Sequence, residues 1–297
     1  MSRPARIIFL PGMKPKPPPE VHLKEICRCL RAGLERVSPE TARALSDECL
    51  TLVSWTFLFY GQHRDVELDR PGIDRILAVP EPSSDDIKEI ESLAIRVTRM
   101  LRVLGDALPF FGRLIAKQRM RLTIAEAHRY LQDRRGVATA IRGLLREVLL
   151  EAWTAGERVL LIGHSLGSVI AYDTLWELSR DEPGSGQVEL FVTLGSPLGT
   201  RMILKGLRGA GRHGRDLYPT NIVRWQNFSA RGELTALHPE LKPFFGEMVD
   251  LGLLESFQDV TGFYNHFRGS DGLDVHMSYG YLINRAVAES VADWLEL

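Results

Sequence analysis

Ser165 lies between two glycines at the point where an aliphatic run gives way to helical spacing. The segment "VLLIGHSLGSVIAYDTL", residues 159–175, has Gly163 and Gly167 two positions to either side of this serine. A nucleophilic serine must hold its hydroxyl clear of the backbone, and a sharp strand-to-helix turn does this at the carboxyl edge of a parallel sheet. Such a turn tolerates little side-chain bulk. The pattern therefore predicts a nucleophile at Ser165; a plain strand–helix turn of small residues is the alternative.

Two backbone N–H groups are candidates for an oxyanion hole, which stabilises the negative charge of an attacked carbonyl oxygen. Leu166 follows the serine and opens the predicted helix, where N–H groups point toward a bound anion. The second donor is expected in the loop "LPGMKPKPPP", where Gly12 permits close backbone approach and Met13 carries an N–H. The prolines of this loop have no N–H and stiffen it. A proline-rich loop without a chemical role is the alternative.

Four histidines follow Ser165 in the sequence, and a serine nucleophile needs one of them as its base: His213, His238, His266 and His276. The first lies in a loop rich in glycine and arginine, and the second follows a turn. His276, in "GLDVHMSYGYL", is expected on a loop just before the final helix, where a catalytic histidine is typical of such folds. His266 falls in a candidate strand and is the second choice.

Glu233 is the carboxylate expected to orient the histidine. It is the first acidic residue after the predicted strand 221–229, in the turn "ARGELTALHPE". Asp216, Asp250 and Asp259 remain alternatives, the first before that strand and the other two considerably further along. An ordinary solvated glutamate in a turn is the competing interpretation of Glu233.

The elements that would position these residues read as an α/β fold with a mostly parallel sheet flanked by helices. Short aliphatic runs bounded by glycine or proline are typical of strands buried on both faces. Helical spacing is found at 20–37 and from 278 to the last residue. The strand candidates are residues 7–10, 50–61, 158–163, 188–195 and 221–229, with a weaker one at 257–267.

Residues 84–155 read as almost entirely helical, with breaks near Pro109 and Gly136. This is more chain than a crossover between two strands needs. We therefore expect a helical cap at 84–155 inserted into a core formed by residues 1–83 and 156–297.

The segment 95–121 within this cap carries seven basic residues and one acidic residue, Asp106, among many apolar ones. A basic amphipathic segment of this kind can lie on an anionic membrane or cover an apolar substrate. We expect a pair of cap helices packed on the core with solvated arginines, and peripheral membrane contact through residues 95–121 is the alternative.

The composition excludes several classes of protein. The formal net charge of −1 over 297 residues gives no reason to expect nucleic-acid binding. The three cysteines, Cys27, Cys29 and Cys49, have no zinc-ligand spacing and read as reduced thiols. The run 7–10 is shorter than the ~7–15 residues of a signal-peptide core. We therefore expect a cytoplasmic protein.

The run "GAGRHG", residues 209–214, matches the glycine spacing of a dinucleotide-binding loop. That loop must follow a strand directly and open a helix, whereas the preceding "TRMILKGLR" has a helical pattern. We therefore predict neither an organic cofactor nor a metal.

These pieces resemble the α/β-hydrolase superfamily, in particular its lipase- and esterase-like members. The similarity covers residues 4–13 and 157–297, and rests on "LIGHSLGSVIAYD", "FVTLGSPLG", "RWQNFSARGELTAL" and "VHMSYGYL". It implies a Ser165–His276–Glu233 triad, with Gly12, Met13 and Leu166 around the oxyanion. The chain departs from the family in having Pro11-Gly12 in place of a His-Gly start, and a glutamate where an aspartate is common.

The resemblance implies a serine hydrolase that cleaves a carboxylic ester, lipid-like or other, through an acyl-enzyme on Ser165. Its partner would be a small-molecule acyl ester. Thioester cleavage and acyl transfer use the same residues and remain alternatives, as does a binding protein of this fold without catalysis. The oligomeric state is open.

Overall fold

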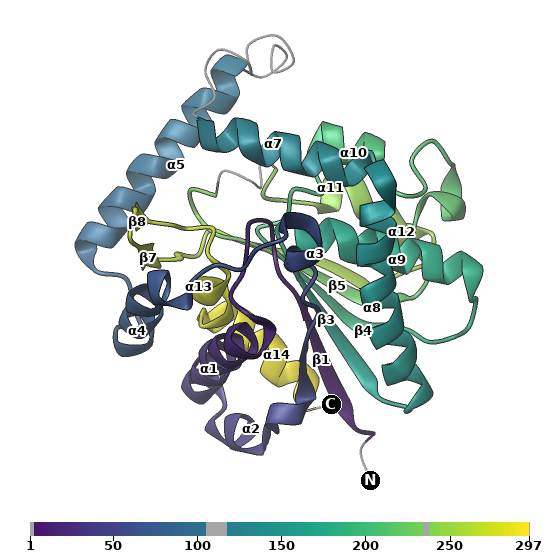
Figure 1. Ribbon diagram of the computed structural model, residues 1–297, viewed down its shortest axis with the longest axis horizontal. Helices are drawn as coiled ribbons and strands as arrows, with labels where there is room; N and C mark the ends of the chain where they lie inside the picture. The colour runs from purple at the N-terminus through teal and green to yellow at the C-terminus, as the bar shows by residue number, and fades with distance from the viewer. Residues whose placement is uncertain (1–2, 105–117, 234–237, 297) are drawn as a thin grey trace.

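The protein is built around a six-stranded parallel sheet. The computed structural model describes residues 3–104, 118–233 and 238–296 (Figure 1). The strands follow the order β2-β1-β3-β4-β5-β6 across the sheet, and every neighbouring pair is parallel. A parallel sheet flanked by helices confirms the predicted α/β class. The strands are β1 (Ala5–Leu10), β2 (Leu50–Leu52), β3 (Arg158–His164), β4 (Val188–Leu194), β5 (Ile222–Ser229) and β6 (Ser256–Thr261), with a short antiparallel hairpin of β7 (Arg268–Gly269) and β8 (Gly272–Leu273).

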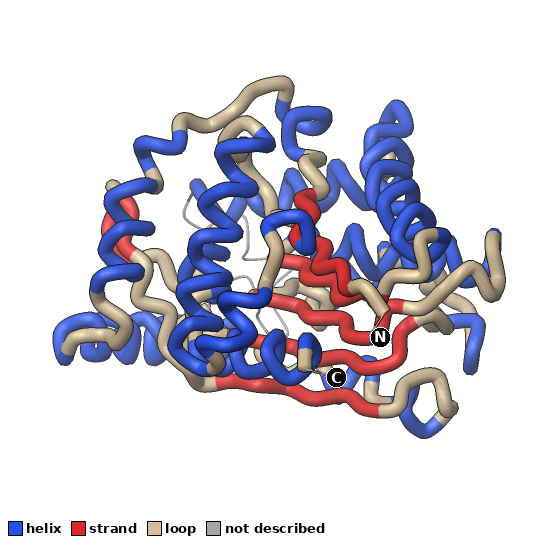
Figure 2. The backbone as a smooth tube through the Cα atoms, turned by 90° about the horizontal axis from the view of Figure 1, so that it is seen from below, coloured by secondary structure: helices blue, strands red, loops and turns tan. Residues whose placement is uncertain are grey.

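Helices cover both faces of the sheet (Figure 2). The alternation of side chains along a strand divides each aliphatic run between two cores. In β1, Ile8 packs in the core with α8 (Val137–Thr154) and α9 (Leu166–Asp181). Ile7 and Phe9 pack in the core on the other face, with α1 (Pro19–Val37) and α14 (Arg285–Leu295). The helices are α1 (Pro19–Val37), α2 (Pro39–Ala44), α3 (Thr56–Tyr60), α4 (Arg70–Ala78), α5 (Ser84–Leu104), α7 (Gln118–Leu131), α8 (Val137–Thr154), α9 (Leu166–Asp181), α10 (Arg201–Gly206), α11 (Lys242–Phe245), α12 (Glu247–Asp250), α13 (Ser278–Leu282) and α14 (Arg285–Leu295).

The strand predicted for residues 50–61 is wrong beyond Leu52. Strand β2 ends at Leu52, and the aromatic residues that follow form α3. The indole of Trp55 donates a hydrogen bond to the Pro11 carbonyl at 2.8 Å, and Phe59 is buried in the core. Tertiary packing of the aromatic side chains therefore overrides their preference for a strand.

The last third of the chain differs in two details from the elements predicted from the sequence. The single helix predicted from residue 278 is two helices, α13 and α14, because the chain turns at Asn284, whose side chain accepts a hydrogen bond from the Ala286 N–H and caps α14. The weak strand candidate is confirmed as β6 but ends at Thr261, so His266 lies in a loop.

The predicted cap divides into helices with different surroundings. The break at Gly136 is confirmed, because Gly136 adopts φ 70° directly before α8, whereas Pro109 lies outside the described residues. Helix α8 buries Ile141, Leu145 and Leu149 in the same core as β3 and α9, so it belongs to the layer that covers the sheet. Helices α5 and α7 lie beyond the carboxyl ends of the strands (Figure 1).

Of the basic segment 95–121, residues 105–117 lie outside the described part of the chain, and membrane contact there stays an alternative. Among the helices that the structure describes, none combines the length and the apolar character needed to cross a bilayer.

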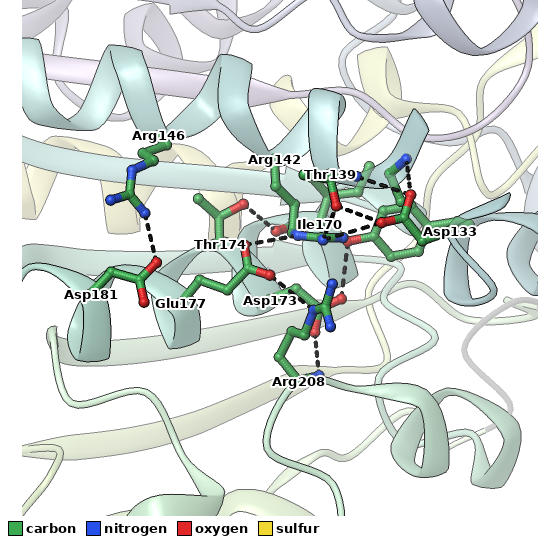
Figure 3. Close-up of polar contacts among 12 residues, drawn as sticks. Asp133, Thr139, Arg142, Arg146, Ile170, Asp173, Thr174, Glu177, Asp181 and Arg208 are labelled. Carbon is green, nitrogen blue, oxygen red and sulfur yellow. Dashed lines mark hydrogen bonds and ion pairs between the residues drawn. The ribbon is translucent and has the colours of Figure 1, made fainter. Parts of the chain in front are cut away.

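A buried polar cluster joins α7, α8 and α9 (Figure 3). Asp173 of α9 accepts hydrogen bonds from the Tyr130 hydroxyl of α7 at 3.0 Å and from the Arg208 N–H at 2.8 Å. Arg142 of α8 reaches Glu177, one turn further along α9, at 2.9 Å, and the Arg208 guanidinium contacts the same carboxylate at 2.9 Å. These contacts fix α7 to the helix that begins directly after Ser165.

Asp173→Asn tests how this buried carboxyl responds to pH. Burial raises the pKa of Asp173 to about 6, although the hydrogen bonds from Arg208 and Tyr130 act in the opposite direction. The folded state therefore binds the proton more tightly than the unfolded chain, and this contribution to stability is lost as pH rises from about 4 to 6. We expect the free energy of unfolding of the wild type to fall by about 2 kcal/mol more than that of the variant between pH 4 and pH 7 in urea titrations.

Asp181→Asn on the same helix is the matched control, because Asp181 is an exposed carboxylate paired with Arg146. This variant should keep the pH dependence of the wild type. An Asp173→Asn protein with the same pH dependence as wild type would contradict the assignment.

Candidate active site

Ser165 has a backbone conformation that side chains rarely adopt. It connects β3 to α9 with φ 54° and ψ −127°, in the region that favours glycine. Its N–H donates to the Leu194 carbonyl at 2.9 Å, and its own carbonyl accepts from the Ser168 N–H at 3.0 Å. Strain of this kind costs on the order of 1–3 kcal/mol and persists only where the surroundings enforce it. The predicted sharp strand-to-helix turn is present.

The two glycines beside Ser165 are required by close backbone contacts. A Cβ at Gly163 would lie 2.6 Å from the Ser168 Cα, and a Cβ at Gly167 would lie 2.4 Å from the Leu10 carbonyl oxygen. Neither neighbour is a flexible side-chain end that could move aside. The glycines let β1, β3 and α9 meet at the turn.

The loop after β1 runs against this turn. A Cβ at Gly12 would lie 2.7 Å from the Ser165 Cβ and 2.8 Å from His164 Nδ1, so the backbone passes directly beside the serine. The neighbouring Lys14 has φ 73° and donates its N–H to the Tyr60 hydroxyl at 2.9 Å. Met13, the proposed oxyanion donor, lies between these two fixed points.

Leu166, the other proposed donor, is the first residue of α9. N–H groups in the first turn of a helix have no intrahelical carbonyl to bind. The two candidate donors therefore come from two different elements, the loop after β1 and the first turn of α9.

His276 and Glu233 are brought together as predicted. Nδ1 of His276 lies 2.8 Å from Glu233 Oε2, and since a carboxylate only accepts, Nδ1 carries the proton. The Tyr281 hydroxyl donates to the same oxygen at 3.0 Å, and it accepts a hydrogen bond from the Ala230 N–H at 3.0 Å. The Glu233 carboxylate is buried, so these hydrogen bonds hold it in one orientation.

Gly195 lies beside this pair at the end of β4. It has φ 54°, and a Cβ there would lie 3.0 Å from both Glu233 Oε2 and His276 Nδ1. A side chain at this position would separate the histidine from its carboxylate.

His164 links the histidine loop to the turn at Ser165. Its Nε2 donates to the His276 carbonyl at 2.7 Å, and the two imidazole rings lie with their centres 4.6 Å apart. The His276 N–H in turn donates to Asp274 Oδ1 at 3.0 Å. A contact between the Ser165 hydroxyl and His276 Nε2 belongs to the proposal below.

The electrostatic surroundings favour a charged His276 and a neutral His164. Burial lowers the pKa of His276, but the charge of Glu233 and the hydrogen bond to it outweigh burial and raise the pKa above its ordinary value. Burial lowers the pKa of His164 well below the usual range, and the nearby His276 lowers it further. Of this pair, His276 is therefore the imidazole that takes up a proton more readily.

The alternative residues are engaged elsewhere. His266 Nε2 lies 2.9 Å from the Val79 carbonyl, and Asp259 accepts hydrogen bonds from the N–H groups of Leu241 and Lys242 at 2.9 Å each. Asp216 and Asp250 lie in other segments, a short 3₁₀ turn at Gly214–Leu217 and α12. Of the residues weighed from the sequence, the structure pairs His276 with Glu233.

Three contributors were not singled out from the sequence, although they lie in the quoted motifs: Tyr281, Gly195 and His164. Each acts through a contact between segments that are distant in the chain, which spacing alone does not reveal. The run 209–214 follows helix α10 rather than a strand, as expected. Within the described residues, no group of three or more His, Cys, Asp or Glu side chains is arranged to hold a metal ion.

No family model, curated protein or solved structure matches the chain. The α/β class is therefore known from the structure itself, and the similarity to α/β-hydrolases rests on the residues alone.

Glu233→Gln tests the pairing with His276. Removing the carboxylate charge should lower the pKa of His276, because an opposite charge at this distance favours the imidazolium. The measurement is a pH titration of the His276 imidazole by NMR. Asp259→Asn, which changes the rival carboxylate, should leave the titration of His276 unchanged; the reverse pattern would assign the acid to Asp259.

Proposed function

We propose that the protein is a serine hydrolase of the α/β-hydrolase type that cleaves a carboxylic ester through an acyl-enzyme on Ser165. The observation that carries this proposal is the strained turn at Ser165 together with the histidine beside it. His164, the neighbour of Ser165, binds the His276 carbonyl, and the buried Glu233 carboxylate orients the His276 imidazole. A purely structural strand–helix turn has no need of left-handed backbone at a serine, nor of a buried Glu–His pair.

In the proposed reaction, the Ser165 oxygen attacks the ester carbonyl while His276 Nε2 takes the hydroxyl proton. Glu233 keeps the Nδ1 proton in place and stabilises the imidazolium that forms. The N–H groups of Met13 and Leu166 bind the oxygen of the tetrahedral intermediate. The intermediate collapses, the imidazolium gives its proton to the departing alcohol, and a water molecule, deprotonated by the same histidine, releases the carboxylic acid and regenerates Ser165.

Tyr281 supports the use of glutamate as the acid. A glutamate side chain has one more rotatable bond than an aspartate, and the Tyr281 hydroxyl and the limited space beside Gly195 restrict this freedom. The longer side chain can therefore reach His276 without losing its orientation.

The test is labelling by a fluorophosphonate, which phosphonylates activated serines, read by intact mass. We expect one adduct on the wild type and none on Ser165→Ala. Ser92→Ala, an exposed serine on α5, is the control and should be labelled like the wild type. Absence of an adduct on folded wild type, with and without detergent, would contradict a hydrolase and favour a binding protein of the same fold.

The labelling rate should also depend on pH through His276. Since only the neutral imidazole accepts the serine proton, the rate should rise as pH increases through the His276 pKa, which lies above its ordinary value of 6.5. In Glu233→Gln, the rise should move to lower pH, and the plateau should fall by about 10²-fold or more. The measurement is a series of stopped labelling reactions at about ten pH values between 5 and 9. A wild-type labelling rate that does not depend on pH over this range would argue against an imidazole base.

A further inference from the structure

Lys16 lies in the loop that passes beside Ser165. The backbone of this loop is fixed on both sides of Pro15: the Lys14 N–H donates to the Tyr60 hydroxyl at 2.9 Å, and the Lys16 carbonyl accepts from the Arg64 N–H at 3.0 Å. Prolines precede and follow Lys16, which further restricts the backbone. Lys14 is exposed, whereas Lys16 is half-buried, so the loop directs the two lysines into different surroundings.

Lys16 interacts electrostatically with His164, His276 and Asp274 of the site described above. The Lys16 ammonium lowers the pKa values of three histidines, His22, His164 and His276. Burial lowers the pKa of Lys16 itself to about 8, and Lys14 and Arg64 act in the same direction. The two carboxylates that counteract this effect are Asp69 and Asp274.

Neither carboxylate is available to Lys16 alone. Asp69 is bound by the Arg64 guanidinium at 2.8 Å, and Asp274 accepts the His276 N–H at 3.0 Å. In the described part of the chain, the ion pairs within 4.0 Å include none to Lys16. Two further polar atoms in this region, Nδ1 of His22 and Nδ1 of His164, are buried without a hydrogen-bond partner among the described residues.

We propose that Lys16 is a specificity residue whose ammonium binds an anionic group, such as a carboxylate, on the acyl ester. This inference rests on the proposed hydrolase function and adds the substrate class to it. A partly desolvated ammonium without an ion pair has lost part of its hydration, and an anion that enters the site restores a favourable partner. Acidic esters would therefore be preferred over neutral esters of the same size.

The test compares two p-nitrophenyl esters with five-carbon acyl groups, the anionic hemiglutarate and the neutral pentanoate. We expect the ratio of kcat/KM values, anionic to neutral, to be about ten or more in the wild type and to fall to about one or below in Lys16→Met, since a tenfold preference corresponds to one well-placed charge contact. Lys14→Met is the matched control from the same loop and should keep the wild-type ratio. A wild-type ratio near one, or an unchanged ratio in Lys16→Met, overturns the proposal.

A second measurement needs no variant. Below pH 8, the ammonium is charged and the preference for hemiglutarate is present; above pH 8, the preference declines as Lys16 loses its proton. The pH dependence of the His276 base cancels in the ratio because both esters use it. The ratio of kcat/KM values for the two esters is measured in half-unit steps from about pH 6.5 to 9.5. A ratio that stays constant over this range overturns the role of Lys16.

The two proposals fail in different ways. Hydrolysis of pentanoate together with a ratio near one rejects the anion preference and leaves the hydrolase standing. Absence of hydrolysis of both esters, together with absence of fluorophosphonate labelling at Ser165, rejects the hydrolase and the substrate class with it.

Discussion

The close approach of three backbone segments at Ser165 is the constraint on which the rest of the site depends. The end of β1, the end of β3 and the start of α9 meet where Gly12, Gly163 and Gly167 have no side chains. Strand β3 is buried along its whole length, and this packing holds the serine in its left-handed conformation. The fold thus compensates the strain of the turn through hydrophobic burial on both faces of the sheet.

The second set of contacts aligns the histidine with that turn. His276 is held from three directions, by Glu233 at its ring, by Asp274 at its N–H and by His164 at its carbonyl. Because Glu233 is buried, its charge acts on the imidazole with little screening by solvent. A short distance between charge and ring, rather than a large number of contacts, sets the protonation behaviour of the pair.

The sequence analysis succeeded where a local pattern determines the structure. The buried strands, the turn at Ser165 and the break at Gly136 follow from hydrophobic runs and glycine positions. The pairing of His276 with Glu233 follows from the place of Glu233 after a strand and of His276 before the final helix. It failed at 50–61, where burial of Trp55 and Phe59 favours α3 over a longer edge strand. Tyr281 could not be predicted, because its hydroxyl acts through an oxygen of Glu233, which is 48 positions away along the chain.

The parallel sheet collects residues from distant parts of the chain at one edge, and this has a consequence for synthesis. Strand β3 and helix α9 leave the ribosome well before α13 and α14, which follow the loop that carries His276. A nascent chain that has emerged as far as α9 contains the three glycines of the turn at Ser165, but the His276 imidazole and the Glu233 carboxylate are still missing. Under the proposed function, the serine therefore gains its base and acid only when these later segments dock.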